Sequence, residues 1–138
     1  MTSKEYFEQQ TTAEIAYHEH NYELTKKACL NILRNIGSIR RDLKKSQLSF
    51  RGINKPFVDY AYFVIDKLGV DEEQKEIIDL LIEQKLITKK YLKEMIDLIP
   101  FNNSGNAKTF FIYLTNKKFL TESEMAIYLK IVNDNSYT

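Results

Sequence analysis

The chain has 138 residues, of which 43% are hydrophobic and 28% charged, and its formal net charge is +1. This length and composition predict one soluble domain spanning residues 1–138, and we expect it in the cytoplasm because no signal peptide or membrane-spanning apolar run is visible. The single cysteine, Cys29, excludes an internal disulfide. The abundance of Lys, Ile and Asn is typical of an AT-rich genome, such as that of a bacterium or its phage.

The small net charge conceals an uneven distribution. Residues 1–25 carry a net charge of −4, residues 26–55 carry +8, and residues 56–138 carry −3. We call residues 26–55 the basic segment. Because positive charge is concentrated there, the basic segment is the part of the chain most suited to an anionic partner.

The first helix signal follows a polar start. Thr11 and Glu14 have the spacing of a capping box, in which a Thr side chain accepts a hydrogen bond from the backbone at the beginning of a helix. We therefore expect a short helix over residues 12–20. Residues 1–11 are expected to form a frayed lead-in.

Residues 21–47 predict the longest helix of the chain. Their apolar side chains form one arc on a helical wheel, as in a helix that packs along one side. Gly37 disfavours this helix by about 1 kcal/mol relative to Ala, so the helix either continues through Gly37 or bends or breaks near it. A break would divide its basic residues between two short segments. Arg40 falls inside the apolar arc, so either its charged end extends to the edge of the arc or the residue lies beyond the packed region. The residues of the apolar arc are Cys29, Ile32, Leu33, Ile36, Ile39 and Leu43.

Residues 57–68 predict a helix that is apolar on most sides. Asp59, Tyr62 and Asp66 form its one polar strip. Such a helix is either central in the fold or part of an interface. The preceding residues, 46–56, contain a Gly and a Pro and predict a loop.

Four further helices are predicted, three of them by capping signals. Thr121 and Glu124 form a capping box, Asp71 opens a run of acidic residues, and Thr88 is an N-cap without the box. An Asn-rich stretch, residues 101–106, predicts a surface loop. The predicted helices span about residues 71–84, 88–99, 107–117 and 121–133, with residues 134–138 frayed.

Two junctions between these helices resemble each other. Residues 81–88 recur as residues 114–121 in their Leu, Lys and Thr positions, and a third junction, residues 67–71, aligns with both without a gap. Such an offset is typical of helical-hairpin repeats, but it also arises when short helices are joined by tight capped turns. No segment alternates with the period of a strand. The sequence therefore predicts an all-α, single-domain bundle of six or seven helices, in which a long N-terminal helix precedes short antiparallel hairpins.

Residues that could carry catalysis or bind metal form no recognisable motif. Glu14, His18 and His20 are close in sequence, but a metal needs three or four convergent ligands, and the two histidines point in different directions on a helix. Cys29 lies in the apolar arc, which is typical of a core side chain and not of a nucleophile. We predict no enzyme activity, no cofactor and no metal site.

The basic segment is the candidate binding site. Four of its cations form a row within about 40° of one another on a helical wheel, opposite the apolar arc. This cationic row consists of Lys27, Arg34, Arg41 and Lys45. Such a row attracts a phosphate backbone or an acidic protein surface. The alternatives are that it is only solvated, or that it pairs with the acidic residues 1–25 and 71–83 of the same chain. The candidate partner- or nucleic-acid-binding residues are Lys27, Arg34, Arg40, Arg41, Lys44, Lys45, Arg51 and Lys55.

Two functions fit these observations. The first is a non-catalytic adaptor, regulator or inhibitor that binds another protein, or a small subunit of a larger nucleoprotein assembly. The second is a nucleic-acid-binding accessory protein that uses the basic segment largely without sequence specificity. No membrane partner is expected. Residues 57–68, with Phe110, Phe111 and Tyr113, also leave self-association open.

Overall fold

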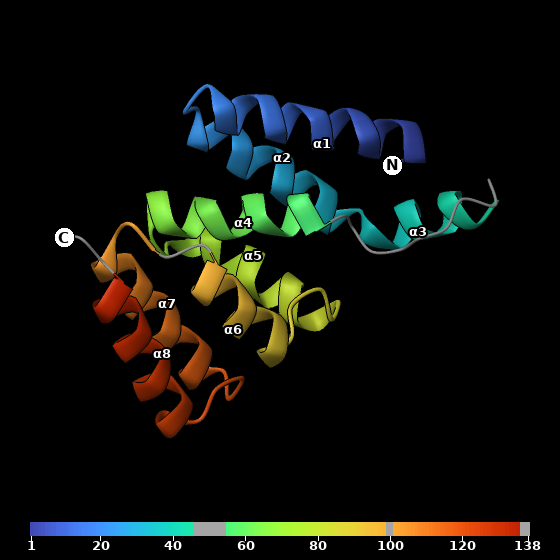
Figure 1. Cartoon of the computed structure of the whole chain (residues 1–138). Coiled ribbons are helices and arrows are strands. Elements are labelled where there is room, and N and C mark those ends of the chain that lie inside the picture. Colours follow the sequence, from blue (N-terminus) through green and yellow to red (C-terminus); the bar gives the residue numbers. More distant parts are fainter. Residues whose placement is uncertain (46–54, 99–100, 136–138) are drawn as a thin grey trace.

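Helices make up all the regular secondary structure of the described residues. The computed structural model describes residues 1–45, 55–98 and 101–135. The eight helices in these ranges (Figure 1) are α1 (Ser3–His18), α2 (Tyr22–Arg34), α3 (Ile36–Lys45), α4 (Lys55–Leu68), α5 (Glu72–Glu83), α6 (Lys89–Leu98), α7 (Ser104–Asn116) and α8 (Glu122–Asn135). None of them is both long and apolar enough to cross a membrane.

The all-α prediction is confirmed, but the described ranges contain eight helices and not six or seven. The predicted long N-terminal helix is two helices, because α2 ends at Arg34 with Asn35 as its C-cap. The Asn35 N–H donates to the Ile32 carbonyl oxygen at 3.1 Å, and its side-chain amide donates to the Asn31 carbonyl oxygen at 2.7 Å. Its own carbonyl then accepts the Ile39 N–H, which opens α3. Of the two alternatives left open by the sequence, the structure therefore shows a break near Gly37, which itself lies inside α3.

The predicted helix over residues 12–20 forms the second half of α1, but its predicted start is wrong, because α1 begins at Ser3 and not after Thr11. Thr2 and Glu5 form the capping box: the Glu5 N–H donates to Thr2 Oγ1 at 3.2 Å, and the Thr2 N–H donates to Glu5 Oε1 at 3.4 Å. Thr11 lies inside the helix, where its hydroxyl donates to the Phe7 carbonyl oxygen. The predicted frayed lead-in is therefore helical.

Helix α4 occupies the centre of the fold and packs against α1, α2, α5 and α7 (Figure 1). Of the two positions predicted for this helix, in the centre of the fold or at an interface, the structure shows the central one. The predicted polar strip is wrong for Tyr62 and Asp66, which are both buried. The Asp66 carboxylate accepts the backbone N–H groups of Asn102 and Asn103, each at 3.0 Å. The core is one cluster of buried side chains to which every helix contributes.

The predicted surface loop over residues 101–106 is a loop only over residues 101–103, because residues 104–106 already belong to α7. Phe101 is buried, and its ring lies 4.7 Å from the ring of Tyr62 between centroids. Asn103 is the N-cap of α7 and accepts the Asn106 N–H through its side-chain oxygen at 3.0 Å. Helix α7 therefore starts at Ser104.

The remaining helices follow the predictions closely. α5, α6 and α8 begin after the predicted caps Asp71, Thr88 and Thr121, and each cap accepts a backbone N–H of the following turn. Helix α8 continues through Asn135, so residues 134 and 135 are not frayed. Residues 136–138 of the predicted tail and residues 46–54 of the predicted loop lie outside the described residues.

Two of the three aligned junctions are the same turn. Lys85 and Lys118 both adopt a positive φ, 57° and 62° respectively, and close the preceding helix in a Schellman motif. The third junction is a shorter turn, in which Gly69 (φ 85°) comes two residues before the cap Asp71. The gap-free alignment thus holds for two junctions. Their matching bonds are Lys85 N–H to Ile82 O and Leu86 N–H to Leu81 O, and Lys118 N–H to Thr115 O and Phe119 N–H to Leu114 O.

Candidate functional site

The apolar arc of residues 21–47 fixes α2 and α3 against the other helices. All six of its side chains are at most 5% exposed, as the wheel predicted. Helix α2 packs against α1, α4 and α5, whereas α3 packs mainly against α1 and extends away from the bundle (Figure 1). The part of the basic segment on α2 and the part on α3 therefore have different surroundings.

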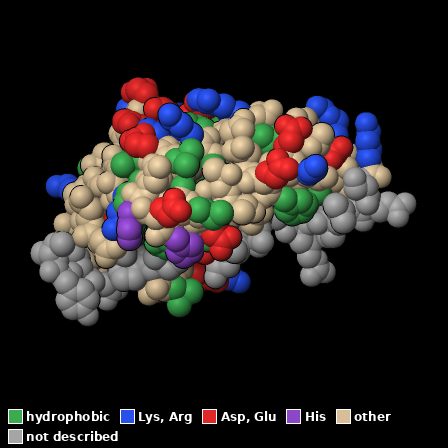
Figure 2. Space-filling view, turned by 90° about the horizontal axis from the view of Figure 1, so that it is seen from above, with side chains coloured by type: hydrophobic (Ala, Val, Ile, Leu, Met, Phe, Trp, Pro, Cys, Tyr) green, Lys and Arg blue, Asp and Glu red, His purple; other side chains and the backbone are tan. Residues whose placement is uncertain are grey.

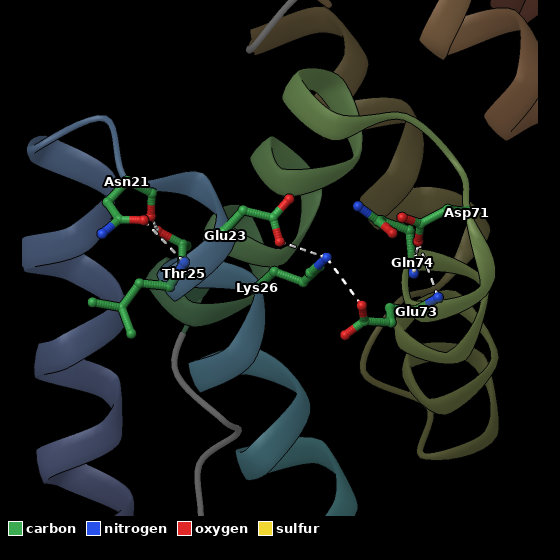
Figure 3. Close-up of polar contacts among 8 residues, drawn as sticks. Asn21, Glu23, Thr25, Lys26, Asp71, Glu73 and Gln74 are labelled. Carbon is green, nitrogen blue, oxygen red and sulfur yellow. Dashed lines mark hydrogen bonds and ion pairs between the residues drawn. The ribbon is translucent and has the colours of Figure 1, made fainter.

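Lys26 is a buried cation between two helices. Its ammonium lies 2.8 Å from a Glu23 carboxylate oxygen and 3.2 Å from a Glu73 carboxylate oxygen, and its side chain is 4% exposed. Figure 3 shows Lys26 of α2 reaching toward Glu73 of α5 with Glu23 beside it. Burial lowers the pKa of Lys26, but its hydrogen bonds to both carboxylates outweigh this, and the pKa lies above its usual value.

Arg34 forms a second link between α2 and α5. Its Nε and Nη2 donate to the two carboxylate oxygens of Glu76, at 2.5 and 2.7 Å. This is the two-pronged geometry that suits a guanidinium and a carboxylate. The hydrogen bonds from Arg34 hold the pKa of Glu76 below its usual range.

Arg40 contacts the far end of α5. It donates to the side-chain oxygen of Gln84 at 3.0 Å and to the Gln84 backbone carbonyl at 3.4 Å. Gln84 is the C-cap of α5, where a cation is favoured by the unpaired carbonyls of the last turn. The predicted reach of Arg40 toward the edge of the apolar arc is therefore confirmed.

The outward side of α3 presents the other cations. Arg41, Lys44 and Lys45 are exposed, and within the described ranges none of them forms an ion pair. We call these three residues the α3 cationic face. In Figure 2, blue side chains gather at the end of the molecule where α3 lies.

The N-terminus of the chain holds α3 in place. The Met1 ammonium donates to Ser38 Oγ at 3.0 Å, and the Ser3 N–H donates to an Asp42 carboxylate oxygen at 2.6 Å. This backbone bond holds the pKa of Asp42 below its usual range. Asp42 is the only acid of the basic segment, and its bond directs it toward α1.

The eight candidate residues thus separate into groups. Arg34 and Arg40 contact α5, and Lys27 is exposed on α2 without an ion pair to any described residue. The α3 cationic face supplies three more. Arg51 lies outside the described residues, and for Lys55 the structure describes only the helical backbone.

The residues considered for catalysis or metal binding lie apart from this surface. His18 and His20 are exposed, and His20 Nδ1 lies 2.9 Å from the Tyr22 hydroxyl. The described part of the chain holds no group of three His, Cys, Asp or Glu side chains arranged to bind a metal. Cys29 is fully buried, and burial raises the pKa of its thiol to about 12.

The aromatic residues that left self-association open belong to the core. Phe110 and Phe111 are buried, and the Tyr113 hydroxyl donates to Asp79 at 2.7 Å. Exposed apolar side chains lie elsewhere, and Phe7 and Ile15 on α1 are two of them. We did not single them out from the sequence, although their spacing of eight residues on one helix was a usable signal.

The geometry divides the basic segment between two roles. Three of its cations, Lys26, Arg34 and Arg40, join α2 and α3 to α5, whereas the α3 cationic face is available to an anionic group from outside. Comparison of the chain with protein-family models, with curated proteins and with solved structures finds no match.

Proposed function

We propose that the protein is a non-catalytic adaptor, regulator or inhibitor whose α3 cationic face contacts an acidic surface of a partner protein. One observation carries this proposal: three exposed cations lie together on one short helix, and none of them forms an ion pair among the described residues. Asp42, the acid on the same helix, accepts the Ser3 N–H, although its charge also attracts Lys45. Contacts from Met1 and Ser3 fix this helix. A surface that is ordered before binding loses less entropy on association.

The positions of the acidic residues favour a protein over a nucleic acid. A phosphate backbone that followed the basic segment from Lys27 to Lys45 would pass the carboxylates of Glu73 and Glu76, which lie beside Arg34 and Lys26. Negative groups on that path repel phosphates. An acidic protein surface needs only a local match of charge, which the α3 cationic face provides.

Recovery of the tagged protein from its native cells tests the proposal. We expect one acidic protein to co-purify in stoichiometric amount with the wild type and to be lost with Arg41→Glu/Lys45→Glu. The matched control is Lys90→Glu/Lys93→Glu, which changes the net charge equally on exposed residues of α6. The proposal fails if the wild type is recovered alone, or if both double variants retain or lose the partner equally.

A nucleic-acid partner is the second candidate, because the same three cations also suit phosphates. Neutralising three phosphates predicts a modest salt dependence, with a slope of about −3 in log affinity against log salt for duplex DNA. Fluorescence anisotropy with labelled duplex DNA and RNA over a range of salt concentrations measures it. Binding at about 0.1 M salt that is lost in the α3 double variant would favour this candidate over the protein partner.

A further inference from the structure

The outer face of α1 carries an exposed apolar stripe. Phe7 and Ile15 are 50% and 52% exposed and lie on the opposite side of the helix from the buried Ala13 and Ala16. The Phe7 ring also lies 5.1 Å from the ring of Tyr6 between centroids. Thr11 lies midway between them, and its hydroxyl is already bonded to the Phe7 carbonyl oxygen at 2.9 Å. Figure 2, which looks onto α1, shows green side chains interrupted by red on this face. We call Phe7, Thr11 and Ile15 the α1 outer stripe.

The stripe is symmetrical about Thr11. Phe7 precedes Thr11 by four residues and Ile15 follows it by four. Each therefore lies about 6 Å from Thr11 along the helix axis and about 40° to one side of it around the helix. If two copies of α1 pack antiparallel about a two-fold axis beside Thr11, Phe7 of each copy lies next to Ile15 of the other. A two-fold interface requires this reciprocal match.

The charges flanking the stripe suit the same arrangement. Lys4 and Glu19 are exposed near opposite ends of α1. Antiparallel packing about Thr11 brings Lys4 of one copy level with Glu19 of the other, on the same edge of the interface. Glu8 and Glu14 lie on opposite edges of the stripe, so that these acids do not face each other across the axis.

We propose that the protein forms a two-fold symmetric dimer through the α1 outer stripe, with a second copy of this chain as its occupant. Thr11 is short, which permits the two helices to approach closely at the axis. One helix pair buries less than the roughly 800 Å² per partner of a standard interface, so the dimer is weak and depends on concentration. The α3 cationic face takes no part in it, and this inference stands apart from the proposed function.

A disulfide across the axis tests the geometry. Helices that pack about 8–10 Å apart between axes place the two copies of residue 11 within disulfide range. Thr11→Cys is therefore expected to form a covalent dimer under mild oxidation. The matched control is Thr109→Cys on α7, since Thr109 is exposed and its hydroxyl bonds a backbone carbonyl in the same way. Cys29 is buried and does not interfere.

Sedimentation velocity measures the association without any cross-link. We expect the wild type to dimerise as its concentration rises, and Ile15→Glu to raise the dimer dissociation constant about tenfold or more, equivalent to about 1.4 kcal/mol. Far-UV circular dichroism verifies that the variant is folded. The inference is overturned if the wild type is monomeric at every concentration, or if Thr11→Cys cross-links no faster than Thr109→Cys.

Discussion

Buried polar side chains hold distant parts of this chain together. Asp66 of α4 accepts two backbone N–H groups just before α7, and Lys26 of α2 lies between Glu23 and Glu73. In each case the charged group is buried together with the hydrogen-bond partners that it needs. Both residues therefore stabilise the fold. Lys26, since it is paired with two carboxylates, is not one of the cations that are available to a partner.

Replacing Asp66 by Ala should lower the free energy of unfolding by about 2–4 kcal/mol, because two buried N–H groups lose their acceptor. Urea unfolding monitored by circular dichroism measures the change. Asp97→Ala, on the exposed side of α6, is the control and should change the stability by less than about 0.5 kcal/mol. Equal effects of the two substitutions would mean that Asp66 has no such structural role.

The pairing of Glu76 with Arg34 predicts a dependence of stability on pH. The pKa of Glu76 is lowered in the folded protein, so the pair stabilises the fold above the unfolded-state pKa of about 4.3. This contribution is lost as the pH falls through the lower folded-state pKa. Glu76→Gln should therefore unfold at lower urea concentration than the wild type at neutral pH, and the difference should vanish in acid.

Glu83→Gln is the control for this titration, since Glu83 is exposed on the same helix and forms no ion pair among the described residues. It should follow the wild type at every pH. If Glu76→Gln also follows the wild type throughout, the contact between Arg34 and Glu76 does not contribute to stability.

Helix ends in this chain are set by local hydrogen bonds, and the sequence predicted some of them. The caps Asp71, Thr88 and Thr121 were predicted correctly, because each precedes an amphipathic stretch. The start of α1 was not, because apolar residues on both its buried and its outer face leave no one-sided pattern. The sequence left open whether the helix breaks near Gly37, since the apolar arc continues across Asn35, and the structure shows a break there.

Substitution of the two candidate N-caps of α1 distinguishes the observed start from the predicted one. Thr2→Ala should lower the free energy of unfolding by about 1 kcal/mol, because it removes the acceptor for the Glu5 N–H. Thr11→Ala should be neutral or slightly stabilising, because Ala is the better residue inside a helix. Urea unfolding of both variants gives the comparison, and the opposite order would contradict a start at Ser3.

The positive φ of Lys85 makes a further prediction about helix ends. A non-glycine residue in this conformation is strained, so Lys85→Gly should stabilise the protein by about 0.5–1 kcal/mol. Lys93→Gly within α6 should destabilise it by about 1 kcal/mol, since there Gly only adds freedom to the unfolded chain. Thermal unfolding of both variants measures whether each substitution raises or lowers the stability. Destabilisation by Lys85→Gly would argue against the Schellman turn.

For the whole molecule, the sequence predicted the place of the basic segment but not its division. The charge distribution and the helical wheel identified the cationic row and its buried opposite side. They could not show that Arg34 pairs with Glu76, or Lys26 with Glu73, because these partners are more than forty residues apart in the chain. Which cations are left for a partner follows only from how α2, α3 and α5 pack.

We propose that the α3 cationic face is the binding surface of the molecule. Site-specific photo-crosslinking in the native cell tests this most directly, with a photoreactive residue placed at Arg41 and, as a control, at Lys93. We predict adducts with one protein species from position 41 and none of that species from position 93. Adducts with nucleic acid at position 41, or the same adducts from both positions, or none from either, would contradict the account.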